Sequence, residues 1–216
     1  MKNFFAFCVL AVLVLASSST LYSATKFGIK AGMISASVNG SQSDNYSSEG
    51  GDAKLIGTSA GAQVEYELDS LWSLSAELIY TQKGYIKNLP GTLVPDSENP
   101  KRGALVGGNR SQTTLKYLEF PVLLKIRPNA NFFVAAGPFA AILSEASLYN
   151  RDSGVVTEQD FKSSVNGLDY GIQGGAGYKT DSFFAEARWG QSFRSVLKSG
   201  ADIKNYTVNF SAGFLI

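Results

Sequence analysis

The sequence predicts an all-β protein, an eight-stranded antiparallel up-and-down transmembrane β-barrel with short periplasmic turns and long extracellular loops. Three observations support this prediction. Segments of about 11–15 residues alternate apolar side chains with small or polar ones, which is the two-residue period of a strand. These segments are longer than most strands of soluble proteins and match the length that a tilted strand needs to cross a bilayer. The connections between them alternate between short and long, as they do in outer-membrane barrels.

The last residues of the chain show the alternation most clearly. Every second residue of "YTVNFSAGFLI", residues 206–216, is apolar or aromatic. A soluble sheet covers such a face with a helix or a second sheet, but no segment after residue 24 has a convincing helical period. We therefore expect lipid to cover the face and the last strand to pair with the first, because backbone groups in lipid need a closed sheet. The alternative is a soluble lipocalin-like barrel or a β-sandwich, in which the same aromatic residues fill a core.

Eight segments carry this pattern. The predicted strands are residues 26–38, 55–68, 72–87, 113–127, 132–146, 165–179, 182–196 and 204–216. The fifth is apolar on both faces, so alternation does not orient it. Polar connections rich in Gly and Ser follow the first, third, fifth and seventh strands, which places all the long loops at one end of the barrel.

Two tight turns predict specific strand registers. A two-residue turn at Thr180–Asp181 places Tyr178 opposite Phe183 and Gln173 opposite Arg188. In the middle hairpin, Pro121 and Pro138 lie at equal distances from the turn "RPNAN". If they lie opposite each other, two ladder donors are missing at one height and the wall is locally loosened.

The N-terminal segment differs from the rest of the chain. Residues 1–24 combine one early lysine, an apolar run and then small residues, the pattern of a secretory signal peptide. We expect cleavage after residue 19, 23 or 24, which leaves 25–216 as the outer-membrane barrel domain; the alternative is a buried N-terminal helix. Removal of Lys2 and Cys8 leaves 18 basic residues, 18 acidic residues and no cysteine. The balanced charge gives no reason to expect nucleic-acid binding, and no disulfide is available.

Charged residues recur on the face that does not meet lipid. They are Lys30, Glu65, Glu77, Lys83, Glu119, Lys125, Glu186, Arg188 and Arg194. The interior of an eight-stranded barrel is just wide enough for side chains, and buried charges need partners. We therefore expect a packed ionic network in the lumen; the functional alternative is a narrow polar pathway.

Aromatic residues concentrate near both ends of the predicted strands. Those near the short turns are Tyr66, Trp72, Tyr178, Phe183 and Phe214, and those nearer the long loops are Tyr80, Tyr170, Trp189, Phe193 and Tyr206. Two such belts are typical of the two membrane–water interfaces of a barrel.

Several stretches carry a family resemblance. The stretches are "GIKAG", "LSAELIYTQKG", "LKYLEFPVLLKI", "FVAAGPF" and "YGIQGGAGY" with "FFAEARW". They resemble the outer-membrane β-barrel family that includes PorT-like proteins, common in Bacteroidetes-type Gram-negative bacteria, over nearly all of residues 25–216. The resemblance implies an eight-stranded outer-membrane barrel but no single activity. PorT itself is associated with a secretion system.

The composition argues against enzymatic chemistry. The chain has no histidine, the side chain best suited to proton transfer near neutral pH. We predict no catalytic residue, no cofactor and no metal site. Glu77 and Glu119 are the candidates for carboxylate-only catalysis, but lysines lie nearby in the pattern and favour ion pairing. Asp44, Glu49 and Asp52 are acidic loop residues without the spacing of an EF-hand, so a solvated loop is the simpler interpretation.

The function we expect is that of a non-enzymatic integral protein of the cell outer membrane, structural or binding through its extracellular loops. The alternatives are a narrow channel or a secretion-associated, PorT-like barrel, and then a membrane enzyme. The expected partners are outer-membrane lipid and lipopolysaccharide, and through the loops another envelope protein or an extracellular ligand, but no nucleic acid.

Overall fold

The structure, a computed structural model, describes residues 25–41, 54–89, 92–94, 104–106, 109–152 and 155–216. The predicted signal segment and the acidic loop residues Asp44, Glu49 and Asp52 lie outside these ranges. No helix within them is both long enough and apolar enough to cross a membrane.

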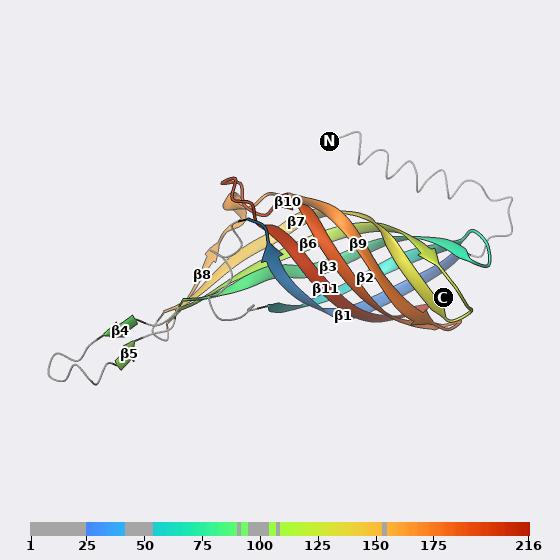
Figure 1. Cartoon of the computed structure of the whole chain (residues 1–216), viewed down its shortest axis with the longest axis horizontal. Coiled ribbons are helices and arrows are strands. Elements are labelled where there is room, and N and C mark those ends of the chain that lie inside the picture. Colours follow the sequence, from blue (N-terminus) through green and yellow to red (C-terminus); the bar gives the residue numbers. More distant parts are fainter. Residues whose placement is uncertain (1–24, 42–53, 90–91, 95–103, 107–108, 153–154) are drawn as a thin grey trace.

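Strands form nearly all of the described chain (Figure 1). They are β1 (Thr25–Asn39), β2 (Leu55–Glu67), β3 (Trp72–Leu89), β4 (Thr92–Val94), β5 (Ala104–Val106), β6 (Asn109–Ile126), β7 (Phe132–Asp152), β8 (Val155–Asp160), β9 (Leu168–Lys179), β10 (Phe183–Ser195) and β11 (Lys204–Leu215), with a 3-10 helix, η2 (Lys162–Ser164). Eight of them form an antiparallel ring in the order β6-β3-β2-β1-β11-β10-β9-β7, which β6–β7 pairing closes. The predicted eight-stranded barrel is confirmed.

The first and last strands of the chain meet in the wall. Ile29 on β1 lies opposite Phe214 on β11. The Phe27 amide donates to the Ile216 carbonyl at 3.1 Å, and the Ile216 amide donates to the Phe27 carbonyl at 2.7 Å. The C-terminus therefore completes the ring, and the barrel wall has no open edge.

The outer face of the wall is apolar and exposed. Met33 on β1 and Phe210 on β11 lie opposite each other, and each side chain is 61% exposed. Large contiguous apolar surfaces of this kind are rare on soluble monomers. No described element packs over them, so the wall faces lipid.

The apolar surface ends at a definite row on the long-loop side. Tyr80, Leu118 and Ile142 form one outward row across β3, β6 and β7, and all three are exposed. The next outward row contains Lys116 and Glu145, which form an ion pair at 2.9 Å. This change from apolar to charged side chains sets the upper limit of the lipid-facing band.

Three strands continue past this limit. β3, β6 and β7 extend beyond the other barrel strands, and β8 adds to the edge of β7 (Figure 1). β4 and β5 pair as a separate short hairpin. The sequence pattern predicts loops for most of these residues, so the long-loop end carries more sheet than expected.

The register predicted for β9 and β10 is wrong by two residues. Tyr178 lies opposite Ala185, not Phe183, and Gln173 lies opposite Gly190. The Thr180 amide donates to the Phe183 carbonyl at 2.7 Å, so the turn residues are 181 and 182 rather than 180 and 181. A shift of two residues keeps every side chain on its predicted face.

The two prolines do not lie opposite each other. Pro121 on β6 lies opposite Phe139 and faces the lumen, whereas Pro138 lies opposite Ile172 of β9 and is exposed on the outer face. Directly opposite residues share a face of the sheet. The prediction that these two prolines remove two ladder hydrogen bonds at the same level of the wall is therefore wrong.

Candidate functional site

The lumen is filled by paired charges. Ten charged side chains are buried among the described residues, five cationic and five anionic: Lys30, Lys83, Lys125, Lys179, Arg188, Glu65, Glu77, Glu119, Asp169 and Glu186. They fall into three groups stacked along the barrel. Each group contains at least one ion pair between strands that are not neighbours in the wall, so each group bridges the lumen.

The group nearest the short turns centres on Glu65 of β2. Lys125 of β6 and Lys179 of β9 approach its carboxylate at 2.8 and 2.6 Å. Glu67, at the rim, accepts from Arg127 at 2.7 Å and pairs with Lys26 at 3.5 Å. These contacts close the short-turn end of the barrel, with two carboxylates held among four cations.

The middle group contains two acidic and two basic side chains, which pair with one another and carry no net charge. Glu77 of β3 accepts from Lys30 at 2.6 Å and from both terminal nitrogens of Arg188, at 2.7 and 2.6 Å. Glu186 accepts from Lys30 at 3.0 Å, from Arg188 at 2.7 Å and from the Ser211 hydroxyl at 2.9 Å. The two-pronged geometry of Arg188 on Glu77 is the strongest kind of charged hydrogen bond.

The third group lies nearest the long loops. Lys83 of β3 pairs with Glu119 of β6 at 2.6 Å and with Asp169 of β9 at 3.4 Å. Its ammonium also lies 4.4 Å from the centre of the Phe139 ring and 5.3 Å from that of Tyr117. Contacts with aromatic faces stabilise a cation, so Lys83 joins the ionic part of the lumen to the apolar part beyond it.

Neutral polar side chains complete the third group. Asp169 accepts hydrogen bonds from the Ser192 hydroxyl at 2.9 Å and from the Asn205 amide at 3.0 Å. Gln173 donates to Glu119. A cavity of about 20 Å³ lies between this group and Arg188, lined also by Thr81. This volume suits about one water molecule.

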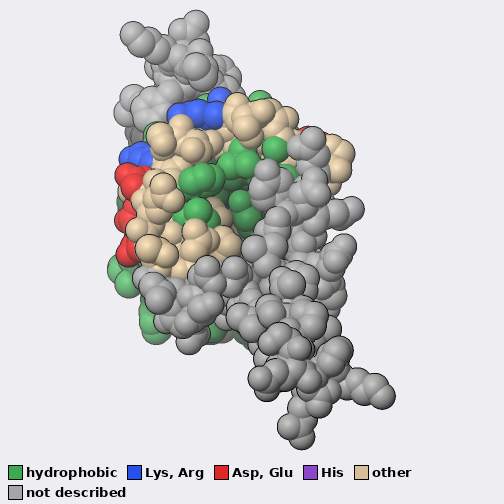
Figure 2. All heavy atoms as spheres, turned by 90° about the vertical axis from the view of Figure 1, so that its left-hand side faces the viewer, with side chains coloured by type: hydrophobic (Ala, Val, Ile, Leu, Met, Phe, Trp, Pro, Cys, Tyr) green, Lys and Arg blue, Asp and Glu red, His purple; other side chains and the backbone are tan. Residues whose placement is uncertain are grey.

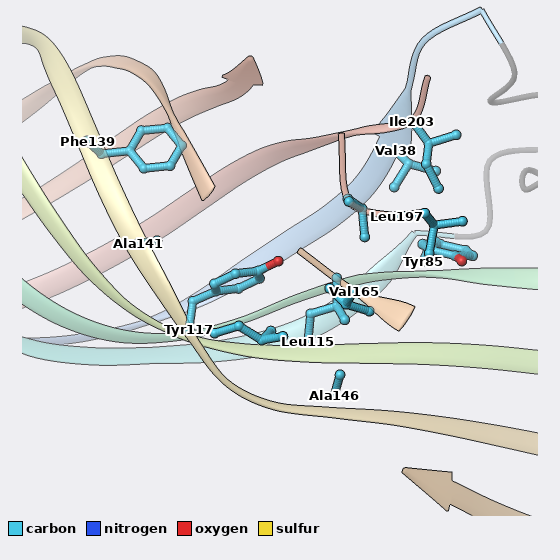
Figure 3. Packing of buried hydrophobic residues seen from close by; sticks show 12 residues of the cluster. Val38, Tyr85, Leu115, Tyr117, Phe139, Ala141, Ala146, Val165, Leu197 and Ile203 are labelled. Atoms are coloured by element: carbon cyan, nitrogen blue, oxygen red, sulfur yellow. The ribbon is translucent and has the colours of Figure 1, made fainter. Parts of the chain in front are cut away.

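Above the charges the lumen is apolar (Figure 3). Leu115, Tyr117 and Phe139 point inward from the wall, and Leu115 and Tyr117 are 0% and 1% exposed. We call residues 162–167 and 196–203 the lid. From the lid, Val165, Val196, Leu197 and Ile203 pack onto this cluster, each no more than 7% exposed. Seen from the long-loop end, apolar side chains fill the centre of the mouth (Figure 2).

Asn166 joins the two segments of the lid. Its amide side chain donates to the carbonyls of Ser195 at 2.8 Å and Leu197 at 3.2 Å, and its main-chain amide donates to the Val196 carbonyl at 2.8 Å. Its side-chain oxygen accepts from Arg194 at 3.2 Å. These bonds hold both segments across the mouth as one unit.

A second contact fixes the lid to the end of β1. Asp202 accepts from the Ser41 hydroxyl at 3.2 Å and pairs with Lys204 at 2.6 Å. The hydrogen bond from Lys204, followed by that from the Ser41 amide, lowers the pKa of the Asp202 carboxyl below its ordinary value. Asp202 is therefore charged at neutral pH and holds the loop between β10 and β11.

The structure brings together eight of the nine charged residues singled out from the sequence. Arg194 is different, because it lies half-buried at the mouth and contacts Asn166 instead of joining a lumen ion pair. Asp169 and Lys179 were not singled out. Both fall on the inward face by alternation, Asp169 near the start and Lys179 at the end of the predicted strand 165–179, so the pattern of the sequence held the signal for both.

The ten aromatic residues of the predicted belts all face outward. Their positions follow the strand alternation, and they are Tyr66, Trp72, Tyr80, Tyr170, Tyr178, Phe183, Trp189, Phe193, Tyr206 and Phe214. Phe183 and Phe214 make an edge-on contact at 5.9 Å near the short turns, and Trp189 and Tyr206 make one at 6.3 Å near the long loops. Phe132, which adds a contact with Tyr178 at 5.5 Å, was not predicted.

Within the described residues, no group of three or more Asp, Glu, Cys or His side chains is placed to hold a metal ion.

Comparisons with known proteins agree with this architecture. A sequence model of the outer membrane protein beta-barrel domain matches residues 17–198. Among solved structures, Neisserial surface protein A (NspA) is 12% identical over 87% of this chain and 96% of its own, with a TM-score of 0.50. Ail of Yersinia pestis, in complex with the heparin analogue sucrose octasulfate, is 14% identical over 89% of this chain and 99% of its own, with a TM-score of 0.48. No curated protein matches significantly.

These findings assign the family. The family match covers most of the chain, and at this identity the likeness to NspA bears on the fold alone. The closed ring, the exposed apolar band and the polar lumen are the features that such a domain needs in the outer membrane. The chain therefore belongs to the outer membrane protein beta-barrel domain family and is an integral protein of the outer membrane.

Proposed function

We propose that this barrel is a non-conducting, non-enzymatic anchor that acts through its extracellular surface. One observation carries the proposal: side chains fill the lumen along its length, first as three groups of ion pairs and then as an apolar cluster under the lid. A solute would have to break buried ion pairs that span the barrel, which is strongly unfavourable. The lack of histidine supports the absence of enzymatic activity.

The surface left for function lies beyond the lipid-facing band. β3, β6, β7 and β8 carry it outward (Figure 1), and extracellular loops on a rigid scaffold are the usual place for binding. We propose that it contacts an extracellular ligand or another envelope protein, while the outer wall contacts lipid and lipopolysaccharide. The two belts of aromatic residues would mark the two membrane–water interfaces. Residues 1–24 would be removed during export.

The resemblance to PorT-like proteins supports a second proposal, in which the partner belongs to the envelope and to secretion. The two proposals place the partner at different ends of the barrel. An extracellular ligand meets the lid and β8, whereas a periplasmic component meets the short turns.

Site-specific crosslinking in intact cells tests both proposals. Residues 25–216 contain no cysteine, so single substitutions Ser164→Cys and Thr157→Cys place a photoreactive probe at the extracellular end, and Ser70→Cys and Asp181→Cys place it at the short turns. We expect adducts from the extracellular probes. Adducts from the short-turn probes alone would reject binding at the extracellular surface and favour the envelope partner.

A further inference from the structure

The lid carries cations that lack acidic partners. Among the Lys and Arg side chains that the structure describes, nine lie in ion pairs. Four do not, and three of these four belong to the lid or touch it: Lys162, Arg194 and Lys198. We call these three the basic patch. Figure 2 shows Lys and Arg side chains at the rim of this end of the barrel.

Hydrogen bonds hold the patch in place without neutralising it. The Lys162 ammonium donates to the Ser144 carbonyl at 2.6 Å, and the Lys198 ammonium donates to the Ser163 carbonyl at 2.8 Å. Asp160 is the acid nearest in sequence, and its carboxylate accepts from the main-chain amide of Lys162 at 2.8 Å. An ammonium has three donors and a guanidinium has five, so each cation keeps donors that these contacts do not use.

The rest of the outer surface of the lid is polar. Ser163, Ser164 and Ser199 are exposed beside the two lysines. The apolar residues of the lid point into the lumen instead, as Figure 3 shows for Val165, Leu197 and Ile203. Protein partners usually need a buried apolar or aromatic anchor, and the exposed residues of the lid, 162–164, 167 and 198–200, include no apolar side chain.

We infer that the basic patch binds a polyanionic glycan, a polysaccharide that carries sulfate or phosphate groups, outside the membrane. The positive charge of the patch complements the negative charge of sulfate or phosphate groups. The exposed serine hydroxyls beside the two lysines can form hydrogen bonds with the hydroxyls of a polysaccharide. The lid covers the lumen, inside the lipid-facing wall, which favours a free chain over a membrane lipid. This inference rests on the proposed extracellular function and names its ligand class.

The test measures binding of fluorescein-labelled dextran sulfate to the folded protein in detergent micelles at physiological salt. Lys162→Gln with Lys198→Gln should weaken binding about tenfold or more, since two charged contacts are lost. The matched control, Lys116→Gln with Lys26→Gln, removes the same charge from lysines away from the lid that are already paired with Glu145 and Glu67, and should change binding little. Labelled neutral dextran should not bind.

A further variant separates loss of charge from loss of lid structure. Lys162→Arg with Lys198→Arg keeps both charges and should retain binding. Equal weakening in the two glutamine variants, or no binding of dextran sulfate by the unsubstituted protein, would overturn the inference. The crosslinking experiment would still report an extracellular partner of another kind, so the two failures are distinguishable.

Discussion

Arg188 on β10 donates two hydrogen bonds to Glu77 on β3, from Nη1 to Oε2 at 2.7 Å and from Nη2 to Oε1 at 2.6 Å. In the ring of eight, β2, β1 and β11 separate the two strands on one side, so the pair spans the full width of the lumen. Both side chains are buried. This one contact ties opposite walls together and blocks the space between them.

The first prediction concerns this pair. Glu77→Leu leaves Lys30 and Arg188 with Glu186 alone and should lower the free energy of unfolding by about 3–5 kcal/mol. Adding Arg188→Met restores neutrality, because Lys30 and Glu186 remain paired at 3.0 Å, and should recover most of the loss. Urea unfolding in lipid vesicles, followed by tryptophan fluorescence, measures both. If the double variant is no more stable than Glu77→Leu alone, charge pairing between Glu77 and Arg188 does not explain the stability of this group.

The second prediction compares two lysines in different surroundings. Lys83→Met leaves Glu119 and Asp169 buried without their cation, and should destabilise the barrel by about 3–5 kcal/mol. Lys116→Met removes a lysine from an exposed pair with Glu145 and should have little effect, because water and salt screen such pairs. The same unfolding assay tests both variants, and equal effects would contradict the account of burial.

How far the sequence predicts this structure depends on the two-residue period. Alternation places Lys30, Glu65 and Glu186 in the lumen because the opposite set on each strand is apolar. It does not fix register, since a slip of two residues preserves both faces, which is why the partners of Tyr178 and Gln173 were wrong. It also fails where both faces are apolar, as on β7, so the inward position of Phe139 could not be predicted.

The partners of the lumen charges could not be predicted either. Glu65 pairs with Lys125 and Lys179, which lie 60 and 114 residues away, across the barrel. Only the closed ring and its stagger bring these strands face to face. The lid was also missed, because its apolar residues are isolated among polar ones and follow no strand period.

The third prediction concerns a glycine in the wall. Gly84 on β3 has a φ of 140°, and a Cβ atom there would overlap the Thr113 carbonyl. Gly84→Ala should therefore cost about 1–3 kcal/mol of stability. Gly167→Ala is the control, since nothing lies within 4 Å of the added atom, and it should be neutral. Equal urea midpoints for the two variants would contradict the backbone strain that we expect from a Cβ atom at position 84.

The fourth prediction concerns the lid. Asn166→Ala removes two donated hydrogen bonds and one accepted bond that join the lid segments. Amide hydrogen exchange in residues 196–203 should become faster, while β9 and β10 keep their protection. Ser199→Ala, at an exposed position in the same loop, should leave exchange unchanged. Unaltered exchange in Asn166→Ala would mean that the side-chain hydrogen bonds of Asn166 do not hold the lid.

The closure of the lumen is tested most directly by conductance across a planar lipid bilayer that contains the purified, folded protein. Three groups of ion pairs and the apolar cluster should leave no path for ions, so we expect no ionic current across the bilayer and no discrete current steps. Reproducible steps that persist over a range of voltages would contradict it and would identify this barrel as a channel.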